Sequence, residues 1–170
     1  MTSAVDHRTD LASPTTGNQP TVADVMIHNP KTLNARASVA DVRAALDDDH
    51  VHMVLLTDGT ALVGTVVRSD LPPAGADGPG LAWATLTGRT VPADYTVSDV
   101  VDLLDQREAR RVAVVGTDRT LLGLVCLKAR RTGFCSDADV ASRSQDRDGV
   151  SRAEHADVLT DVLTRDAPNR

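Results

Sequence analysis

Two stretches of this chain share one pattern and lie a nearly constant distance apart. Residues 62–71 read LVGTVVRSDL and residues 121–130 read LLGLVCLKAR, so an apolar strand that contains a glycine occurs twice. Val39 corresponds to Val97, 58 residues later, and the glycines of the two strands are 59 residues apart. A fixed period of this size indicates two copies of one small unit that bury their apolar faces against each other.

The same order of elements is predicted in both copies. Thr21 and Ser38 precede apolar residues at helical spacing and are predicted helix N-caps. The first copy is expected to hold a short helix after Thr21, an extended piece at 32–33, a helix after Ser38, and strands at 53–56 and 62–67. The second is expected to hold a short helix at 83–86, an extended piece at 90–91, a helix after Thr96 or Ser98, and strands at 112–115 and 121–127. One residue is predicted to be added before the second hairpin, so that Val54 corresponds to Ala113. The fold class is therefore α/β.

The repeat also predicts how the chain is divided. Residues 1–20 are polar, without apolar periodicity, and are predicted to be disordered. The two repeats are expected at 21–71 and 81–144, joined by a linker at 72–80 that is rich in Pro and Gly. Residues 145–170 form a predicted tail with a candidate helix at 152–165.

Composition excludes several classes of function. A net charge of −6 disfavours nonspecific nucleic-acid binding, which requires a positive surface. No apolar run is long enough to span a membrane, and the N-terminus lacks the pattern of a signal peptide, so we expect a soluble cytoplasmic protein. Two cysteines form no zinc signature, and no phosphate loop, nucleophile elbow or zinc-hydrolase motif is present. We therefore expect neither an enzyme nor a metal site.

The repeated order of elements resembles a pair of CBS (cystathionine-β-synthase) domains. The residues that carry the resemblance are VADVMIHNPKTL, SVADVRAAL, HMVLLTD and LVGTVVRSDL in the first copy, and WATLTGRTV, TVSDVVDLL, RRVAVVGTD and LLGLVCLKA in the second. The resemblance implies two βαββα repeats packed about a pseudo-twofold axis, an arrangement called a Bateman module, which often forms a homodimer. It also implies regulation of a partner protein through an adenosine-containing ligand such as an adenine nucleotide or S-adenosylmethionine, without catalysis.

The resemblance implies a ligand site at the end of the third strand of a repeat. There the family carries a hydroxyl side chain and, three residues later, an Asp that accepts hydrogen bonds from both ribose hydroxyls. The first copy keeps the carboxylate as Asp70 but has Val67 at the hydroxyl position, whereas the second copy has Cys126 and Ala129. One cleft at most is therefore expected to bind ribose. Its predicted ligand-binding residues are Asp70, Ser69, Arg68, Thr32, Met53 and Val54. The alternative is that Asp70 only caps the following turn or faces solvent.

Other polar groups allow further hypotheses. Basic side chains gather near the end of the second copy's third strand, where they would attract anions if they converge. We favour the alternative that they offset the acidic charge of the chain or pair with Asp137 and Asp139. These side chains are Arg107, Arg110, Arg111, Lys128, Arg130 and Arg131. His50 and His52 lie two apart without an evident third metal ligand. Cys135 precedes a predicted helix cap at Ser136, which makes a thiol redox role a third hypothesis for the chain.

Two functions of different classes follow from these patterns. The first is a stand-alone regulatory CBS pair that binds an adenosine-containing ligand in a single cleft and signals to a partner. The second is a degenerate CBS pair that binds no small ligand and serves as a dimerisation or scaffold module, as the losses at Val67, Cys126 and Ala129 indicate.

Overall fold

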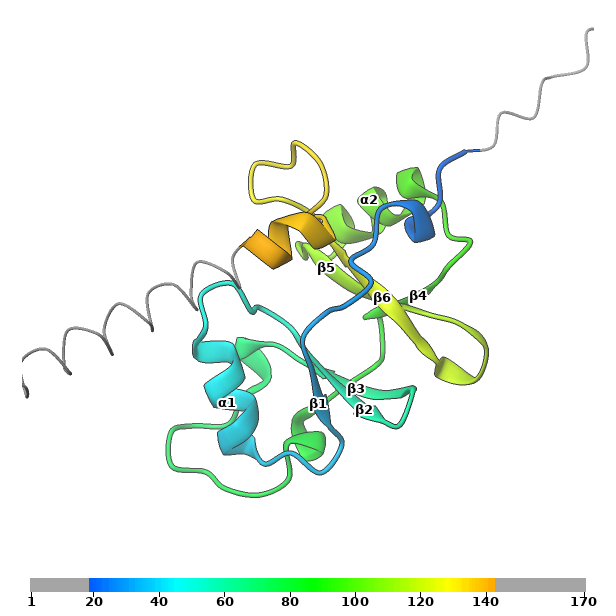
Figure 1. The fold of residues 1–170 in the computed structure, drawn as a ribbon. Helices are drawn as coiled ribbons and strands as arrows, with labels where there is room; N and C mark the ends of the chain where they lie inside the picture. Colours follow the sequence, from blue (N-terminus) through cyan, green and yellow to red (C-terminus); the bar gives the residue numbers. More distant parts are fainter. Residues whose placement is uncertain (1–18, 143–170) are drawn as a thin grey trace, which may run out of the picture.

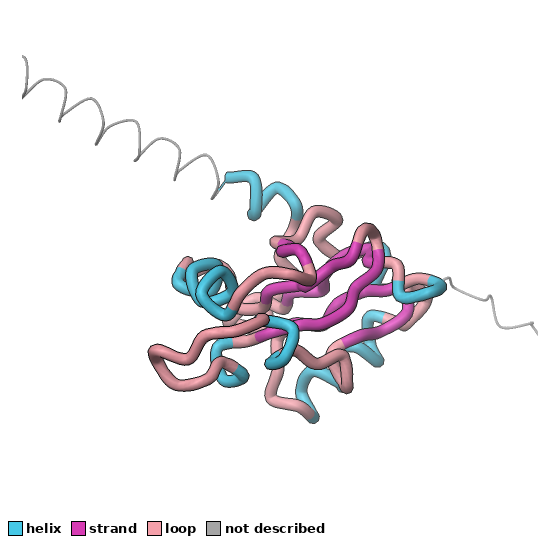
Figure 2. The backbone as a smooth tube through the Cα atoms, turned by 90° about the horizontal axis from the view of Figure 1, so that it is seen from below, coloured by secondary structure: helices cyan, strands magenta, loops and turns pink. Residues whose placement is uncertain are grey.

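The computed structural model describes residues 19–142, and these form two similar halves (Figure 1). Each half contains a three-stranded sheet, with strand order β1-β2-β3 in one and β4-β5-β6 in the other. In both sheets the first strand is parallel to the second, and the second is antiparallel to the third. The two sheets lie close together in the middle of the molecule, with short helices around them (Figure 2). The predicted α/β class is confirmed.

The first repeat follows the expected order. It consists of β1 (Thr32–Asn34), α1 (Val39–Asp47), β2 (Val54–Asp58), β3 (Ala61–Val66) and a 3-10 turn, η2 (Arg68–Asp70). Ser38 caps α1, because its hydroxyl oxygen accepts the Asp41 backbone N–H at 3.1 Å and the Asp41 carboxylate accepts the Ser38 N–H at 2.8 Å. The closing helix of a βαββα unit is here only the turn η2, since Pro72 disfavours helical geometry at Leu71.

The second repeat contains β4 (Thr90–Pro92), α2 (Val97–Gln106), β5 (Arg111–Val115), the turn η4 (Thr117–Arg119) and β6 (Leu121–Cys126). Thr96, not Ser98, caps α2, since the Asp99 N–H donates to the Thr96 hydroxyl at 3.1 Å. A further helix starts at Asp137, and the predicted cap at Ser136 is confirmed by the Asp139 N–H, which donates to the Ser136 hydroxyl at 3.2 Å.

The strand register corrects the predicted correspondence between the repeats. Thr32 pairs with Leu55 in the first sheet, and Thr90 pairs with Ala113 in the second. Ala113 therefore corresponds to Leu55, and the prediction that it corresponds to Val54 was wrong. The additional residue lies within the second hairpin at 116–120, where η4 forms, and not before it.

The two repeats exchange the segments that precede their first strands. The turn η1 (Val22–Asp24) lies against the second repeat, where the Val22 N–H donates to the Tyr95 carbonyl at 2.8 Å. The turn η3 (Gly80–Trp83) lies against the first repeat. Ile27 and Leu124 exchange two backbone hydrogen bonds, and Thr65 and Thr85 do the same at the corresponding place, as the pseudo-twofold axis requires.

Strand alternation divides the core into three parts. On β2, Val54 and Leu56 face α1, whereas Leu55 faces the other sheet. A core of aliphatic side chains lies in each repeat, and a third joins the two sheets through Met53, Leu55, Leu62, Ala113 and Leu124. Because the chain has few aromatic residues, mainly Val and Leu side chains fill the core. Because the repeats share both segments and core, they form one unit.

Close packing at the exchanged segments leads to a first prediction. A Cβ atom at Gly123 would lie 2.5 Å from the Ile27 carbonyl oxygen, a backbone atom that cannot move without breaking the crossing of the N-terminal segment. We expect Gly123→Ala to lower the free energy of unfolding by about 1–2 kcal/mol in urea denaturation. Gly116→Ala is the matched control, since its Cβ would meet only the flexible Leu122 side chain at 3.3 Å. Equal losses in the two variants would contradict the tight crossing.

The remaining predictions about the chain ends fall partly outside the described residues. Residues 1–18 of the predicted disordered segment lie outside the described residues, as does the whole predicted tail with its candidate helix at 152–165. The segment 72–80 connects the repeats, and its end is bound to α1 through a hydrogen bond from the Val39 N–H to the Gly78 carbonyl. The repeat boundaries at 21–71 and 81–144 stay a prediction. Within residues 19–142 no helix has the length and apolarity to cross a membrane.

Candidate ligand site

Asp70, the predicted ribose acceptor, is bound by an arginine of the other repeat. Its two carboxylate oxygens accept hydrogen bonds from the Arg89 guanidinium at 2.5 and 2.8 Å, and one of them also accepts the Val67 N–H at 2.8 Å. The side chains of Asp70 and Arg89 are 19% and 23% exposed. This bidentate pair joins the end of the first repeat to the residue that precedes β4.

The pair determines the ionisation of Asp70. Burial alone would raise the pKa of this carboxyl group, but the Arg89 and Val67 hydrogen bonds and the Arg89 charge together lower it. Asp70 is therefore ionised at neutral pH, with both oxygens engaged inside the protein. A ribose would have to compete with Arg89 for them.

Beside this pair, the described residues of the two repeats form a cleft. The β3–β4 cleft, named after the strands whose ends it separates, has a volume of about 440 Å³. It is lined by His52, Met53, Val67, Ser69, Thr87, Gly88, Arg89, Leu103, Leu104, Arg107, Glu108, Ala109, Arg110, Arg111 and Val112. The Arg107 guanidinium is bound to the Gly88 carbonyl at one wall. Asp70 itself does not line this cleft, whereas Arg89, which binds its carboxylate, does.

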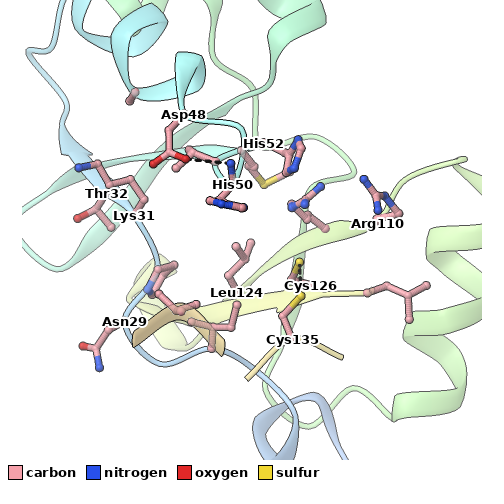
Figure 3. Close-up of a pocket in the computed structure, with 18 of the residues that line it drawn as sticks. Asn29, Lys31, Thr32, Asp48, His50, His52, Arg110, Leu124, Cys126 and Cys135 are labelled. Carbon is pink, nitrogen blue, oxygen red and sulfur yellow. Dashed lines mark hydrogen bonds between the residues drawn. The ribbon is translucent and has the colours of Figure 1, made fainter. Parts of the chain in front are cut away.

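A second cleft has a volume of about 790 Å³ and lies between the start of β1 and the end of β6 (Figure 3). The pseudo-twofold axis relates it to the first cleft. This β1–β6 cleft is lined by Ile27, Asn29, Pro30, Lys31, Thr32, Ala44, Ala45, Asp48, His50, Val51, His52, Met53, Arg110, Arg111, Leu124, Cys126, Leu127, Lys128, Ala129, Cys135 and Val140. In Figure 3, His50 and His52 lie on one side, and Leu124, Cys126 and Cys135 lie opposite them. Its volume is in the range of small-molecule sites.

The β1–β6 cleft combines apolar and cationic walls. Ile27, Met53 and Leu124 are nearly fully buried and supply an apolar surface. Among residues 19–142, four cations line the cleft, Lys31, Arg110, Arg111 and Lys128, against the one carboxylate of Asp48. Asp48 itself accepts the His50 N–H at 2.9 Å. The arrangement suits a flat apolar group attached to an anion.

Two of the titratable groups in this cleft are affected by burial. Burial lowers the pKa of Arg111, which nevertheless stays a cation at neutral pH because guanidinium groups do not deprotonate in proteins. Burial, followed by the charges of Arg111, Arg110 and Arg68, lowers the pKa of His52. His52 is thus neutral at pH 7 and offers hydrogen bonds instead of charge.

The structure distributes the six predicted site residues over several places. Thr32 lines the β1–β6 cleft, Ser69 the β3–β4 cleft, and Met53 lines both. Val54 is fully buried in the first core, and the Arg68 side chain is exposed. The reason is that each cleft lies between the first strand of one repeat and the third strand of the other. Residues of a single repeat therefore do not form one site.

Arg89 and Lys31 were missed by the sequence analysis. They occupy corresponding positions, 58 residues apart, directly before the first strand of each repeat. Arg89 meets Asp70, whereas Lys31 lies in the cleft whose wall has Ala129 at the corresponding place. The repeat contained the signal, since both positions are basic, but only the exchange between the halves shows which residues they face.

The basic cluster of the second repeat only partly pairs as we expected. Lys128 lies 3.5 Å from the Asp139 carboxylate, but Asp137 is bound by His28 at 2.8 Å. Arg131 pairs with Asp105 of α2. Among residues 19–142, neither Arg110 nor Arg111 has a carboxylate within salt-bridge distance. Within the described part of the chain, these two arginines at the clefts can attract an anion. The described part of the chain contains no group of three or more His, Cys, Asp or Glu side chains that would hold a metal ion.

Fold and clefts together define a class: a tandem α/β repeat with two symmetry-related clefts between its halves. The family model of the CBS domain matches residues 22–71 and 89–129 of this sequence. The chain belongs to the CBS domain family, as the sequence resemblance indicated. A comparison with curated proteins finds no match.

Solved structures of CBS pairs share the fold. The cytosolic domain of the Mg²⁺ channel MgtE, in complex with ATP, is 19% identical with a TM-score of 0.54; the match covers 64% of this chain and 46% of that one. The CBS domain protein TA0289 of Thermoplasma acidophilum is 24% identical with a TM-score of 0.53, over 64% and 66% of the two chains. The CBS pair of MJ0100, in complex with 5′-methylthioadenosine and S-adenosylmethionine, is 17% identical with a TM-score of 0.54, over 76% and 98%. The chain thus spans about half of the MgtE domain, and these identities establish the fold alone.

Proposed function

We propose that this chain is a regulatory CBS pair that binds an adenine nucleotide in the β1–β6 cleft and passes its bound state to a partner protein. The observation that carries the proposal is the set of four cations around an apolar wall, with Arg110 and Arg111 unpaired by carboxylates among residues 19–142. The purine would pack on the aliphatic side chains and the phosphates would lie near the cations. Related folds solved with ATP and with S-adenosylmethionine support an adenosine ligand.

The proposal keeps a single ligand cleft but places it differently from the sequence analysis. Asp70 is engaged by Arg89, so the β3–β4 cleft offers no free carboxylate to a ribose. The β1–β6 cleft has Ala129 instead of the carboxylate, and affinity there would come from phosphate contacts. We further propose a cytoplasmic homodimer, the usual form of a Bateman module, that does not act as an enzyme.

A second candidate function is the scaffold module that binds no small ligand. It is favoured by one observation: neither cleft combines an open volume with a carboxylate at the family's ribose position. Thermal denaturation in the presence of ATP, AMP, S-adenosylmethionine and adenosine separates the two functions, because a ligand of the folded state raises the midpoint. The absence of any shift would favour the scaffold.

Calorimetric titration of ATP into matched variants tests the location of the site. We expect Arg111→Met to weaken ATP binding about 10- to 100-fold, the value of one charge-assisted hydrogen bond of about 1.5–3 kcal/mol. Lys31, exposed at the rim, lines only the β1–β6 cleft. Lys31→Ala should weaken binding about fivefold, and more at low salt. Adenosine should bind more weakly than ATP, because it brings no phosphate.

Thr87→Val is the control for location, since Thr87 lines only the β3–β4 cleft and is exposed. Its ATP affinity should equal that of the wild type. If Thr87→Val loses affinity while Lys31→Ala does not, the nucleotide binds in the other cleft and the proposed location is wrong.

A further inference from the structure

The only two cysteines of the chain meet at the wall of the β1–β6 cleft. The Cys135 and Cys126 sulfur atoms lie 3.2 Å apart, joined by a dashed line in Figure 3. Their residues are 7% and 6% exposed, and both sulfurs are free thiols. Nothing in the proposed nucleotide function uses this pair.

Backbone pairing holds the two residues opposite each other. The Cys135 N–H donates to the Cys126 carbonyl at 2.7 Å, the next pair, Leu127 and Phe134, forms an antiparallel bridge, and the Lys128 N–H donates to the Gly133 carbonyl at 2.9 Å. Directly opposed residues of this kind have Cα atoms about 5.5 Å apart. A disulfide accepts Cα separations of about 4.4–6.8 Å, so the backbone already has suitable spacing.

Little movement separates the thiols from a bond. A disulfide has an S–S length of about 2.05 Å, and the sulfurs at 3.2 Å need to approach by only about 1.2 Å, within the range of a small side-chain rotation. Ile27 and Val140 pack against the pair and give it an apolar side. On the other side lies the β1–β6 cleft, which both cysteines line. A small oxidant therefore has a route to sulfur atoms that the outer surface covers.

We propose that Cys126 and Cys135 form a reversible oxidation site, which a small disulfide such as oxidised glutathione converts into an intramolecular disulfide. One protein thiolate attacks a glutathione sulfur, and the glutathione S–S bond breaks with release of one glutathione thiol. The second cysteine then attacks the mixed disulfide, forms the Cys126–Cys135 bond and releases the other glutathione. Two protein thiols are oxidised, one glutathione disulfide is reduced, and both thiol protons end on glutathione.

Burial should slow this exchange, and the position of the pair determines which segments the disulfide would join. Burial raises the pKa of Cys126 to about 11, so few thiolates exist at neutral pH and exchange should be slow. Arg111 lies opposite Cys126 in the β5–β6 pairing, so the disulfide would form beside a residue that we propose binds the phosphates of the nucleotide. It would also tie the end of β6 to the residue before the helix cap at Ser136.

Equilibration of the full chain with glutathione buffers of increasing oxidised fraction tests the site. After acid quenching, denaturation and alkylation, alkylatable thiols should fall from two to none and return on reduction. Trypsin cuts the chain between the cysteines at Lys128, Arg130 and Arg131. Peptides 120–128 and 132–143 should therefore stay linked only in the oxidised sample. On a denaturing, non-reducing gel this sample should run as a single chain, because the disulfide does not join two chains. The oxidised chain should also have a higher thermal midpoint than the reduced one.

Controls separate a native site from chance oxidation. Cys135→Ala and Cys126→Val keep apolar side chains at both buried positions, and neither should show linked peptides or a redox-dependent thermal midpoint. The same titration in urea measures the unfolded chain, and the folded chain should oxidise in buffers at least about tenfold more reducing. The proposal is overturned if two thiols can still be alkylated in the most oxidising buffer. It is also overturned if glutathione adducts or disulfides between chains form in place of the linked peptides, or if the chain oxidises equally in urea.

Discussion

Val22→Asp is expected to unfold the second repeat, although Val22 precedes the first. The Val22 side chain is fully buried among Val91, Val100 and Leu104, which belong to β4 and α2. A carboxylate there would lose its water without gaining a partner, because the surrounding side chains are aliphatic. We expect the free energy of unfolding to fall by more than about 4 kcal/mol, which is most of the stability of a domain at the lower end of the ordinary range of about 5–15 kcal/mol.

Graded variants and a local probe check this result. Val22→Ala removes two methyl groups and should cost about 1–3 kcal/mol in urea denaturation. Hydrogen exchange on Val22→Ala should show the loss of protection first in α2 and β4, since these elements pack on Val22. A loss that appears first in α1 and β2, or a Val22→Asp variant as stable as the wild type, would contradict the exchange of segments.

Local signals in the sequence were sufficient for the elements and their order. The helix caps at Ser38 and Ser136 follow from side-chain oxygens placed before apolar residues at helical spacing, and both make the expected hydrogen bonds. The period of the repeat predicted two similar sheets. These features depend on residues a few positions apart, which the sequence shows directly.

Features that depend on pairing between distant residues were harder to predict from the sequence. The sequence did not show whether the extra residue of the second repeat lies before its hairpin or within it. The register of β5 and β6 shows that it lies within the hairpin. The family resemblance assigned Val54 to the site, but alternate residues of β2 face opposite sides of the sheet, and Val54 lies on the side that packs in the core of the first repeat.

The candidate site depended on the exchange between repeats. The resemblance to the family grouped Thr32 with Asp70 of the same copy, but the fold places Thr32 opposite the end of β6. Arg89 could not be assigned to Asp70 without this crossing. The basic residues were correctly noted, yet their pairing with the acidic segment was expected to be more extensive than the single contact of Lys128 with Asp139.

Removing Arg89 should expose the dependence of the fold on the Asp70 pair. In Arg89→Met the Asp70 carboxylate keeps only the Val67 N–H as a donor, in a site where it is mostly shielded from water. We expect a loss of about 1–3 kcal/mol in the free energy of unfolding at pH 7, less than for a fully buried pair because water still reaches both side chains. Arg68→Met, on the same turn but exposed, is the matched control and should change stability by less than about 0.5 kcal/mol.

The pH dependence of this loss identifies the carboxylate as its cause. The folded state lowers the pKa of Asp70, so the pair stabilises the wild type fully above the ordinary carboxyl pKa of about 4, and this stabilisation is lost as the pH falls through the folded value. Without Arg89, burial favours the protonated acid, which is tolerated better as the pH falls. The difference between wild type and Arg89→Met in urea denaturation should therefore be largest near pH 7 and shrink below pH 4. Adding Asp70→Asn to Arg89→Met should remove most of its pH dependence, and a difference that stays constant from pH 7 to pH 3 would show that Arg89 acts through its packing and not through Asp70.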